Sequence, residues 1–305
     1  MKILNKLHKY MAVAVLMGLS GQVSAELQIF ACEPEWASLA EELGGDKVTA
    51  YSATTGLQDP HHIQARPSLI AKIRNADMLA CTGAELEIGW LPLLLQRASN
   101  SNIQPGKPGH FLASEHVRLL GIAKRIDRSQ GDVHASGNPH IQTNPANIKR
   151  IAKAMNDTLQ QLDNANAAYY QQRFDDFNRR WKVALRKWKT MLRPLKNSDI
   201  VVHHNSWLYL QDWLDLNNVA TLEDKPGIPP SSGHLVNILE LMKTQPVRMI
   251  VRAAYQSDRA ALWLSAKTDI PIVVLPFTIG GNEQAVDLFS LYDNTFEMML
   301  KAAKL

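Results

Sequence analysis

Residues 164–192 read NANAAYYQQRFDDFNRRWKVALRKWKTML, a stretch in the middle of the chain that contains no turn signal. Apolar side chains recur in it at spacings of four and three, at Tyr170, Phe174, Phe177, Trp181, Ala184, Trp188 and Met191. This period places them on one face of an α-helix. With about 1.5 Å per residue, the stretch predicts a single helix about 45 Å long.

Two interpretations fit an apolar stripe of this kind. A heptad repeat can form a coiled coil with a second copy of the chain. We favour a helix that packs across two halves of one chain, because the stripe carries large aromatic side chains and lies midway along the sequence. We therefore expect a monomer. The other face is basic and is typical of a solvated surface, with Arg179, Arg180, Lys182, Arg186, Lys187 and Lys189.

Short apolar runs alternate with amphipathic stretches on both sides of this helix. Such alternation predicts parallel strands with helices on both faces of a sheet. Before the helix, these segments are 27–31, 34–43, 48–51, 67–75, 78–81 and 86–96, with a further helix starting at Asn144-Pro145. After it, they are 200–203, 207–214, 219–222, 235–244, 249–251, 259–267 and 272–275, followed by a last helix to Lys304.

The predicted fold class is therefore α/β, with two lobes, each a mostly parallel sheet flanked by helices, joined by one long backbone helix. We expect an N-terminal lobe over residues 26–163, the linking helix over 164–193 and a C-terminal lobe over 194–305. A chain of this length is more naturally two lobes than one.

The first 25 residues have the features of a cleavable export signal. Three lysines precede an apolar run from Met11 to Leu19, and small residues follow as far as Ala25, where we expect cleavage. The apolar run is too short to span a bilayer. Cys32 is a conceivable lipid-attachment site, but it lies well beyond that run, so we expect a soluble periplasmic protein.

The charge of the mature chain is close to neutral. Removal of the three signal lysines from 33 basic residues leaves 30 against 29 acidic residues. This balance argues against a nucleic acid or another polyanion as a partner. The two cysteines, Cys32 and Cys81, each end a strand-like run, so a disulfide between neighbouring strands is expected in an exported protein. Free buried thiols and zinc ligation are the alternatives.

Three of the ten histidines share one setting, in which each follows a strand or a turn and precedes a helix. They are His61 in Asp59-Pro60-His61-His62, His140 in Asn138-Pro139-His140, and His204 at the end of residues 199–204. Ligands in open α/β sheets bind beyond the carboxyl ends of strands, where such loops gather. Zn²⁺ accepts neutral imidazole nitrogen readily, whereas Mn²⁺ and Mg²⁺ prefer carboxylate oxygen. The three histidines are therefore candidate zinc ligands.

Each histidine taken alone has an ordinary alternative as a surface residue or a hydrogen-bonded residue, and it is the repeated setting that favours a metal site. The proline before His61 and before His140 restricts the backbone, which helps to preorganise a ligand loop. Successive side chains of a strand face opposite ways, so His203 and His204 cannot both point into one site, and the period alone does not choose between them.

Together these motifs resemble the periplasmic metal-binding receptors of zinc and manganese ABC importers, the zinc-type substrate-binding proteins of cluster A-I. The resemblance covers nearly all of the mature chain. It is carried by Asp59-Pro60-His61 with Arg66-Pro67-Ser68, by Asn138-Pro139-His140, and by His204-Asn205-Ser206-Trp207 with Tyr209.

The resemblance implies a solute-binding protein that captures Zn²⁺ between two lobes and delivers it to the permease of an ABC importer in the inner membrane. It assigns His61, His140 and His204 as metal ligands, and it implies a long helix between the lobes. Zn²⁺ would then be transported cargo rather than a catalytic cofactor.

Two departures from the family pattern leave the fourth ligand open. Residues 128–137 are short and contain only one histidine, where zinc receptors often have a long histidine-rich loop. Residues 274–281 contain no acid, where many members supply a carboxylate ligand. The absence of carboxylates favours zinc over manganese. The remaining candidates for the fourth position are water, His62, His134, Glu33, Glu35 and Glu283.

Other functions compete with this one. A receptor for Mn²⁺ or another divalent metal is the nearest alternative, and an adhesin or zinc chaperone without an importer is a third. A zinc-dependent hydrolase or hydratase could also use three histidines with an open position. The sequence has no His-Glu-x-x-His motif, so we expect no enzyme. Metal binding by imidazole is expected to weaken as pH falls through about 6.5.

Overall fold

A computed structural model describes residues 26–122 and 131–304 of the chain. The export signal predicted for residues 1–25 lies outside this described part. The first sheet has four parallel strands in the order β2-β1-β3-β4. They are β1 (Leu27–Ala31), β2 (Val48–Ser52), β3 (Met78–Cys81) and β4 (His110–Leu112).

The second sheet repeats this plan with four parallel strands in the order β6-β5-β7-β8. Its strands are β5 (Asp199–Val202), β6 (Asn217–Thr221), β7 (Met249–Ala253) and β8 (Ile272–Leu275). In each sheet the second strand in the chain lies on one side of the first strand, and the third and fourth lie on the other side. The strand order therefore has a switch point next to β1 in one sheet and next to β5 in the other, where ligands can bind. The predicted α/β class with two mostly parallel sheets is confirmed.

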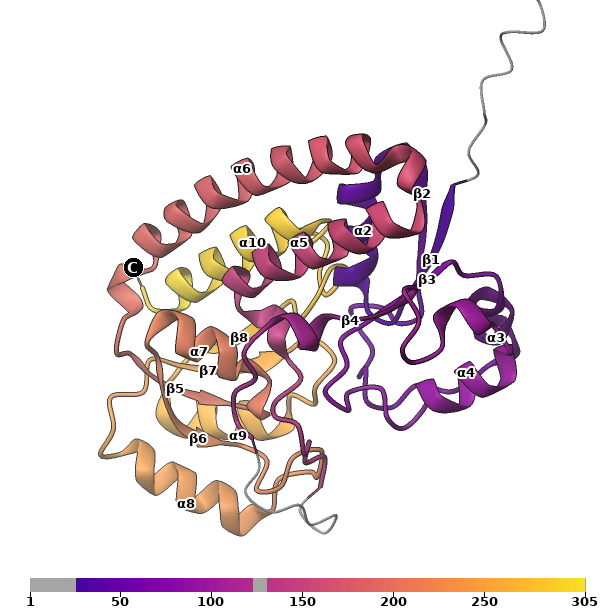
Figure 1. Cartoon of the computed structure of the whole chain (residues 1–305). Helices are drawn as coiled ribbons and strands as arrows, with labels where there is room; N and C mark the ends of the chain where they lie inside the picture. The colour runs from indigo at the N-terminus through magenta and orange to yellow at the C-terminus, as the bar shows by residue number, and fades with distance from the viewer. Residues whose placement is uncertain (1–25, 123–130, 305) are drawn as a thin grey trace, which may run out of the picture.

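Helices cover both sheets, and most begin where the sequence predicts (Figure 1). Pro34 and Pro67 occupy the first turns of α2 and α3, and Asn144 caps α5 by accepting the N–H of Ala146. The helices besides the linking helix are α2 (Pro34–Gly44), α3 (Pro67–Arg74), α4 (Leu91–Ala98), α5 (Pro145–Leu162), α7 (Leu208–Leu214), α8 (Ser232–Met242), α9 (Arg259–Thr268) and α10 (Leu288–Ala302).

Two features of the N-terminal half differ from the prediction. The helix expected over residues 86–96 begins only at Leu91, because Ala84 and Glu85 both adopt positive φ angles and form a turn. Strand β4 was not predicted, since its three residues are too few to show an alternating pattern.

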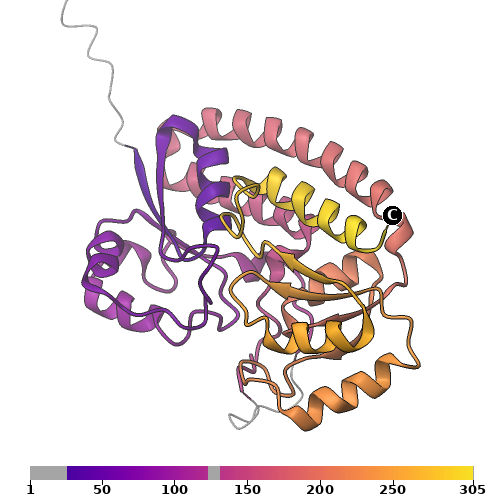
Figure 2. The same cartoon turned by 180° about the vertical axis from the view of Figure 1, so that it is seen from behind.

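The long helix is α6, Ala167–Met191, preceded by a short 3₁₀ turn. It runs along one side of the molecule and spans both halves (Figures 1 and 2). Its buried aromatic side chains pack on α5, α2 and α10 of the same chain. Trp181 lies 5.1 Å from Phe177 and 5.2 Å from Trp188, measured between ring centroids. The apolar stripe is therefore buried within one chain, as the linking-helix interpretation predicts.

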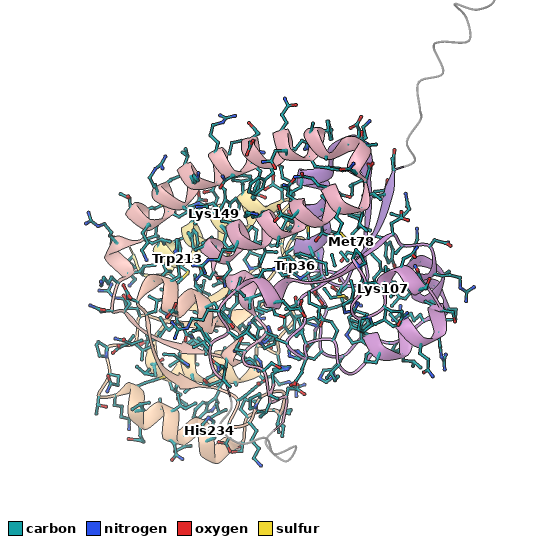
Figure 3. All side chains as sticks on the ribbon, in the orientation of Figure 1. Trp36, Met78, Lys107, Lys149, Trp213 and His234 are labelled. Atoms are coloured by element: carbon teal, nitrogen blue, oxygen red, sulfur yellow. A yellow bond between two sulfur atoms is a disulfide. The ribbon has the colours of Figure 1, made fainter. Side chains whose placement is uncertain are left out.

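One hydrophobic core runs through both halves. It joins residues of β1 and α2 to residues of β5, β7, β8 and α10, with α5 and α6 between them. In Figure 3, Trp36 lies in this interior, whereas Lys107 and Lys149 lie at the surface. Smaller clusters lie under α3 and α4 and under α8 and α9. Within the described residues, no helix combines the length and the apolar character that a bilayer crossing requires.

The predicted disulfide joins Cys32 and Cys81, whose Cα atoms are 4.8 Å apart. Cys32 follows β1 directly and Cys81 ends β3, and these two strands are hydrogen-bonded neighbours. Both cysteines are fully buried. The bond therefore ties the switch point of the first sheet together.

Candidate metal centre

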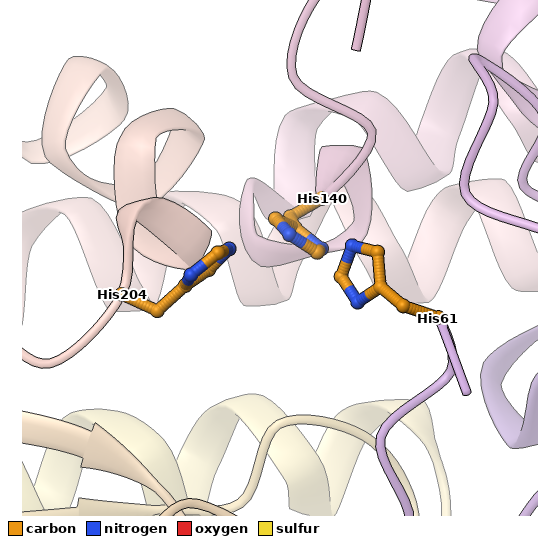
Figure 4. A group of neighbouring side chains, drawn as sticks. All are labelled: His61, His140 and His204. Atoms are coloured by element: carbon orange, nitrogen blue, oxygen red, sulfur yellow. The ribbon is translucent and has the colours of Figure 1, made fainter. Parts of the chain in front are cut away.

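Three histidines from distant parts of the chain meet at the junction of the two halves. Figure 4 shows the rings of His61, His140 and His204 facing one another from three separate segments. Their ring centroids lie 5.3 Å apart for His61 and His140, 5.5 Å for His140 and His204, and 6.0 Å for His61 and His204. One nitrogen of each ring lies within 4.8 Å of the other two. The spacing suits a single small cation.

His61 lies in the loop between β2 and α3, and Asp59 fixes its ring. Asp59 Oδ1 accepts the backbone N–H of His61 at 3.0 Å and lies 2.7 Å from its Nδ1. Burial opposes ionisation of Asp59, but the hydrogen bonds from His61 outweigh it and lower the pKa of Asp59. An ionised carboxylate can only accept, so Nδ1 carries the hydrogen and Nε2 keeps its lone pair. Trp90 holds the loop by donating to the carbonyl of Pro60 at 2.9 Å.

His204 follows β5, and Glu223 fixes its ring in the same way. Glu223 Oε2 lies 2.6 Å from Nδ1 of His204 and also accepts the N–H of Gly227 at 2.8 Å. Its other oxygen lies 3.4 Å from Nε2 of His203. Burial opposes ionisation of Glu223, but the hydrogen bonds from His203 and His204 outweigh it and lower its pKa to about 2. Nε2 of His204 therefore also keeps a free lone pair.

His140 lies deepest of the three, with 1% of its surface exposed. Neither of its ring nitrogens has a hydrogen-bond partner within the part of the chain that the structure describes. Its backbone N–H donates to Oδ1 of Asn138 at 3.0 Å, and the hydroxyl of Tyr209 donates to the carbonyl of Asn138 at 2.7 Å. Burial lowers the pKa of His140 well below its usual value, and protonation of the nearby rings of His61, His204 or His134 would lower it further. A buried imidazole without partners is costly unless an ion occupies its nitrogen.

The candidates for a fourth ligand lie in different places. Glu33 accepts from the hydroxyl of Thr82, and Glu35 accepts from Thr278 in the loop after β8. His62 is 65% exposed and pairs with Asp132, whereas Glu283 is exposed. Nε2 of His134 lies 3.2 Å from Nε2 of His61. Of these candidates, His134 is the one with a ring nitrogen within hydrogen-bond distance of a cluster nitrogen.

A cavity of about 680 Å³ opens beside the cluster on the side of the second sheet. Its walls include His61 and His204 together with the loops that follow β5, β6 and β7. This is the switch point of the second sheet, where the carboxyl ends of β5 and β7 meet. The cluster is therefore accessible from solvent through this cavity.

Sequence reasoning left the choice between the adjacent histidines open, and the structure places His204 in the cluster. His203 is not part of the cluster, although its Nε2 lies 3.4 Å from the same Glu223 side chain. Sequence reasoning also gave no role to Asp59 and missed Glu223. The only signal for Glu223 is its position two residues after β6, the neighbour of β5 in a parallel sheet.

The arrangement offers a divalent cation three uncharged imidazole nitrogens, two of them held in one tautomer by carboxylates. Because Asp59 and Glu223 each carry one negative charge next to the ligand rings, together they balance the two positive charges of such an ion. This donor set suits borderline-soft cations such as Zn²⁺.

Comparison with known proteins places this chain among metal-transport proteins. A sequence model of the family described as ZnuA, zinc-uptake complex component A, periplasmic, matches residues 29–303. The manganese ABC transporter substrate-binding lipoprotein PsaA of Streptococcus anginosus is 24% identical over 294 residues, which cover 92% of this chain and 90% of the relative. The metal ABC transporter substrate-binding lipoprotein SloC of Streptococcus mutans serotype c is 24% identical over 260 residues, which cover 83% and 81%.

Solved structures share the fold. A crystal structure of ZnuA superposes with a TM-score of 0.75 at 20% identity and covers 92% of this chain and 98% of that one. The cadmium-bound periplasmic metal binding protein from Candidatus Liberibacter asiaticus gives a TM-score of 0.75 at 16% identity and covers 91% and 100%. At these identities the likeness concerns the fold alone.

Proposed function

Because the chain belongs to the family of the zinc-uptake complex component A, we propose that it captures Zn²⁺ for import. It is an extracytoplasmic, metal-binding, substrate-binding protein of an ABC transporter. The proposal concerns its cargo and the residues that hold it. We assign His61, His140 and His204 as ligands.

The observation that carries the proposal is the donor set of the cluster. Three imidazoles lie within reach of one ion, and the two carboxylates that contact ligand rings, Asp59 and Glu223, accept from ring nitrogens. Zn²⁺ favours this set, whereas Mn²⁺ favours carboxylate oxygen. The printed names of the relatives include both zinc and manganese proteins, so the donor set is the argument for zinc.

The remaining parts of the proposal follow from this role. We propose that the export signal is cleaved, that the mature protein is a monomer in the periplasm, and that it delivers Zn²⁺ to the permease of an ABC importer in the inner membrane. We divide the chain into an N-terminal lobe of residues 26–163, a linking helix of 164–193 and a C-terminal lobe of 194–305. The two sheets support this division, since each falls within one lobe.

We also propose that the protein performs no catalysis. A hydrolytic zinc site needs a general base that can reach the attacking water. Asp59 and Glu223 each already accept hydrogen bonds from a histidine ring, and Asp132, which also lines the cavities beside the cluster, lies 3.6 Å from Nε2 of His62. Turnover of an ester, a β-lactam or carbon dioxide by the zinc-loaded protein would contradict this part of the proposal.

Elemental analysis of the purified protein, with competitive titrations of Zn²⁺ and Mn²⁺, tests the cargo. We expect one zinc per chain and tighter binding of Zn²⁺ than of Mn²⁺. His61→Ala, His140→Ala and His204→Ala should each weaken zinc binding strongly. His116→Ala is the matched control, since His116 stacks on Phe111 away from the cluster. Equal losses in the control and in the three variants, or preferential binding of Mn²⁺, would refute the assignment.

A further inference from the structure

A fourth histidine meets the cluster at its open side. Nε2 of His134 lies 3.2 Å from Nε2 of His61. Because Nδ1 of His61 donates to Asp59, Nε2 of His61 has a lone pair and no hydrogen. The two nitrogens are therefore placed as a pair of donors would be placed around one ion.

The distance agrees with this geometry. Zn–N bonds of about 2.0–2.1 Å in a tetrahedral site separate the ligand nitrogens by about 3.3–3.4 Å. The 3.2 Å between His61 and His134 is close to that edge. Two nitrogens of one tetrahedral zinc site would lie about this far apart.

His134 also borders a space that it shares with the other two histidines. A small cavity of about 100 Å³ is lined by His134, His140 and His204 together with the residues around them. His140, one of these lining residues, has two ring nitrogens without a hydrogen-bond partner among the described residues. A space of this size accepts one ion or a few water molecules. His134 therefore closes a space that is already bordered by the other two rings.

The opposite side of the cluster is apolar. Phe277, in the loop after β8, packs edge-on against His140 with ring centroids 5.3 Å apart. The next residue, Thr278, donates its hydroxyl to Glu35. This loop therefore presents a ring rather than an oxygen donor to the cluster. Among the described residues, the side of His134 is therefore the one from which the structure brings a further ring nitrogen to the cluster.

The segment that carries His134 is held by both halves of the molecule. The N–H of Ala135 donates to Oε2 of Glu85 at 2.6 Å, and the N–H of Asp132 donates to the carbonyl of Pro226 at 2.9 Å. Gly131 adopts φ of +83°, and a Cβ there would lie 2.1 Å from the same carbonyl oxygen, so only glycine fits this contact. The segment is thus positioned by contacts that do not depend on metal.

We infer that His134 is the fourth protein ligand of the ion, completing a tetrahedral site of four imidazoles with His61, His140 and His204. This inference rests on the proposed function, because it deepens the same site. It makes the bound ion fully coordinated by protein, with no position left for water. A closed site of this kind is typical of zinc that is held rather than used for catalysis.

X-ray absorption of the zinc-loaded wild-type protein tests the inference without any variant. We expect four nitrogen neighbours at about 2.0–2.1 Å, all from imidazole. His134→Ala should replace one imidazole by a water-derived oxygen, which lacks the scattering from the outer atoms of the ring. It should also weaken zinc binding at least about 10-fold, a loss no smaller than that from an outer-shell change. His62→Ala is the matched control, because His62 is adjacent in the chain to His61 but is 65% exposed. It should change neither measurement.

The outcomes separate this inference from the proposed function. A wild-type spectrum with three imidazoles and one oxygen, or His134→Ala with unchanged affinity while His140→Ala loses binding, would overturn the role of His134 and leave the zinc receptor intact. Failure of the wild-type protein to bind Zn²⁺ would overturn the proposed function itself. Thermal unfolding of metal-free His134→Ala, compared with metal-free wild type, identifies a loss of affinity that arises from misfolding.

Discussion

Replacement of Glu223 by glutamine tests whether carboxylates behind the ligand rings balance the charge of the ion. Glutamine has the shape of glutamate and keeps an oxygen acceptor. Its oxygen can occupy the position of Oε2, where it would still accept from Nδ1 of His204 and from the N–H of Gly227. The variant therefore removes one negative charge while it preserves the hydrogen bonds that position the ring.

The size of the effect follows from the distance between the ion and the carboxylate. An ion on Nε2 of His204 would lie about 6.5 Å from Oε2 of Glu223, with a metal–nitrogen bond of about 2.0 Å, a ring about 2.2 Å across and the hydrogen bond in series. Charges of +2 and −1 at that distance attract by about 1 kcal/mol in water and by about 5 kcal/mol at an effective dielectric constant of about 20. The side chain of Glu223 is 10% exposed, so its surroundings lie between these limits.

We therefore expect Glu223→Gln to weaken zinc binding by about 10–100-fold, the range known for outer-shell partners of metal ligands. The assay is competition for Zn²⁺ against a fluorescent chelator at neutral pH, at low and at moderate salt. The matched control is Glu240→Gln, because Glu240 forms an exposed ion pair with Lys243 on α8. A change of less than about twofold in Glu223→Gln, or an equal change in the control, would refute the charge-balance argument.

Three further predictions concern protons and the disulfide. Burial and the neighbouring histidines lower the pKa of His134 to about 4 and the pKa of His140 well below its usual value, so both rings stay uncharged between pH 7 and 5 in the metal-free protein. As the pH falls, the zinc dissociation constant should therefore rise with a slope of at most two protons. A steeper slope in isothermal titrations at several pH values would contradict this. Burial raises the pKa of Glu35 from 4.5 to about 7, although the hydrogen bond from Thr278 opposes this shift. The buried, protonated carboxyl group therefore contributes stability that is fully present below pH 4.5 and is lost as the pH rises through about 7. Glu35→Gln should match wild type near pH 4.5 and exceed it by up to about 3 kcal/mol at pH 8 in denaturant unfolding, and a difference independent of pH would contradict this. Reduction of the disulfide between Cys32 and Cys81, 49 residues apart, should lower the unfolding free energy by on the order of 4 kcal/mol while the zinc stoichiometry stays the same, and loss of zinc on reduction would revive the idea that these cysteines bind it.

The parts of the fold that follow from local periodicity could be predicted from sequence. The stripe from Tyr170 to Met191 has the period of a helix, and α6 covers almost the same residues. The apolar runs at Leu27–Ala31 and Met78–Cys81 became strands with the same bounds. Strand and helix alternation predicts that these strands are parallel and allows them to be neighbours, and the structure shows that they pair. The disulfide follows in turn from that pairing.

The parts of the site that depend on loops could be predicted only in outline. His61, His140 and His204 share a setting in the sequence, and the structure brings them together. Glu223 has no such signal, since its role depends on β6 lying beside β5. His134 was one of several open candidates, because the fold of its segment is decided by contacts to Glu85 and to Pro226, far away in sequence. Local pattern does not report contacts of this kind.

The shared core also indicates how the ion can leave. A hinge that separated the two sheets would have to open part of the core that joins the two halves, for example where the hydroxyl of Tyr292 on α10 donates to the carbonyl of Gln142. An aromatic side chain such as Tyr292 buries about 150–250 Å². At about 25 cal/mol per Å², exposing one ring costs about 4–6 kcal/mol. The loops that carry His61 and His134 lie at the edge of this core and are held mainly by a few hydrogen bonds. Movement of these loops is therefore the less costly route to release. Substitutions that remove these loop hydrogen bonds should raise the rate of zinc dissociation and should have a smaller effect on the stability of the fold.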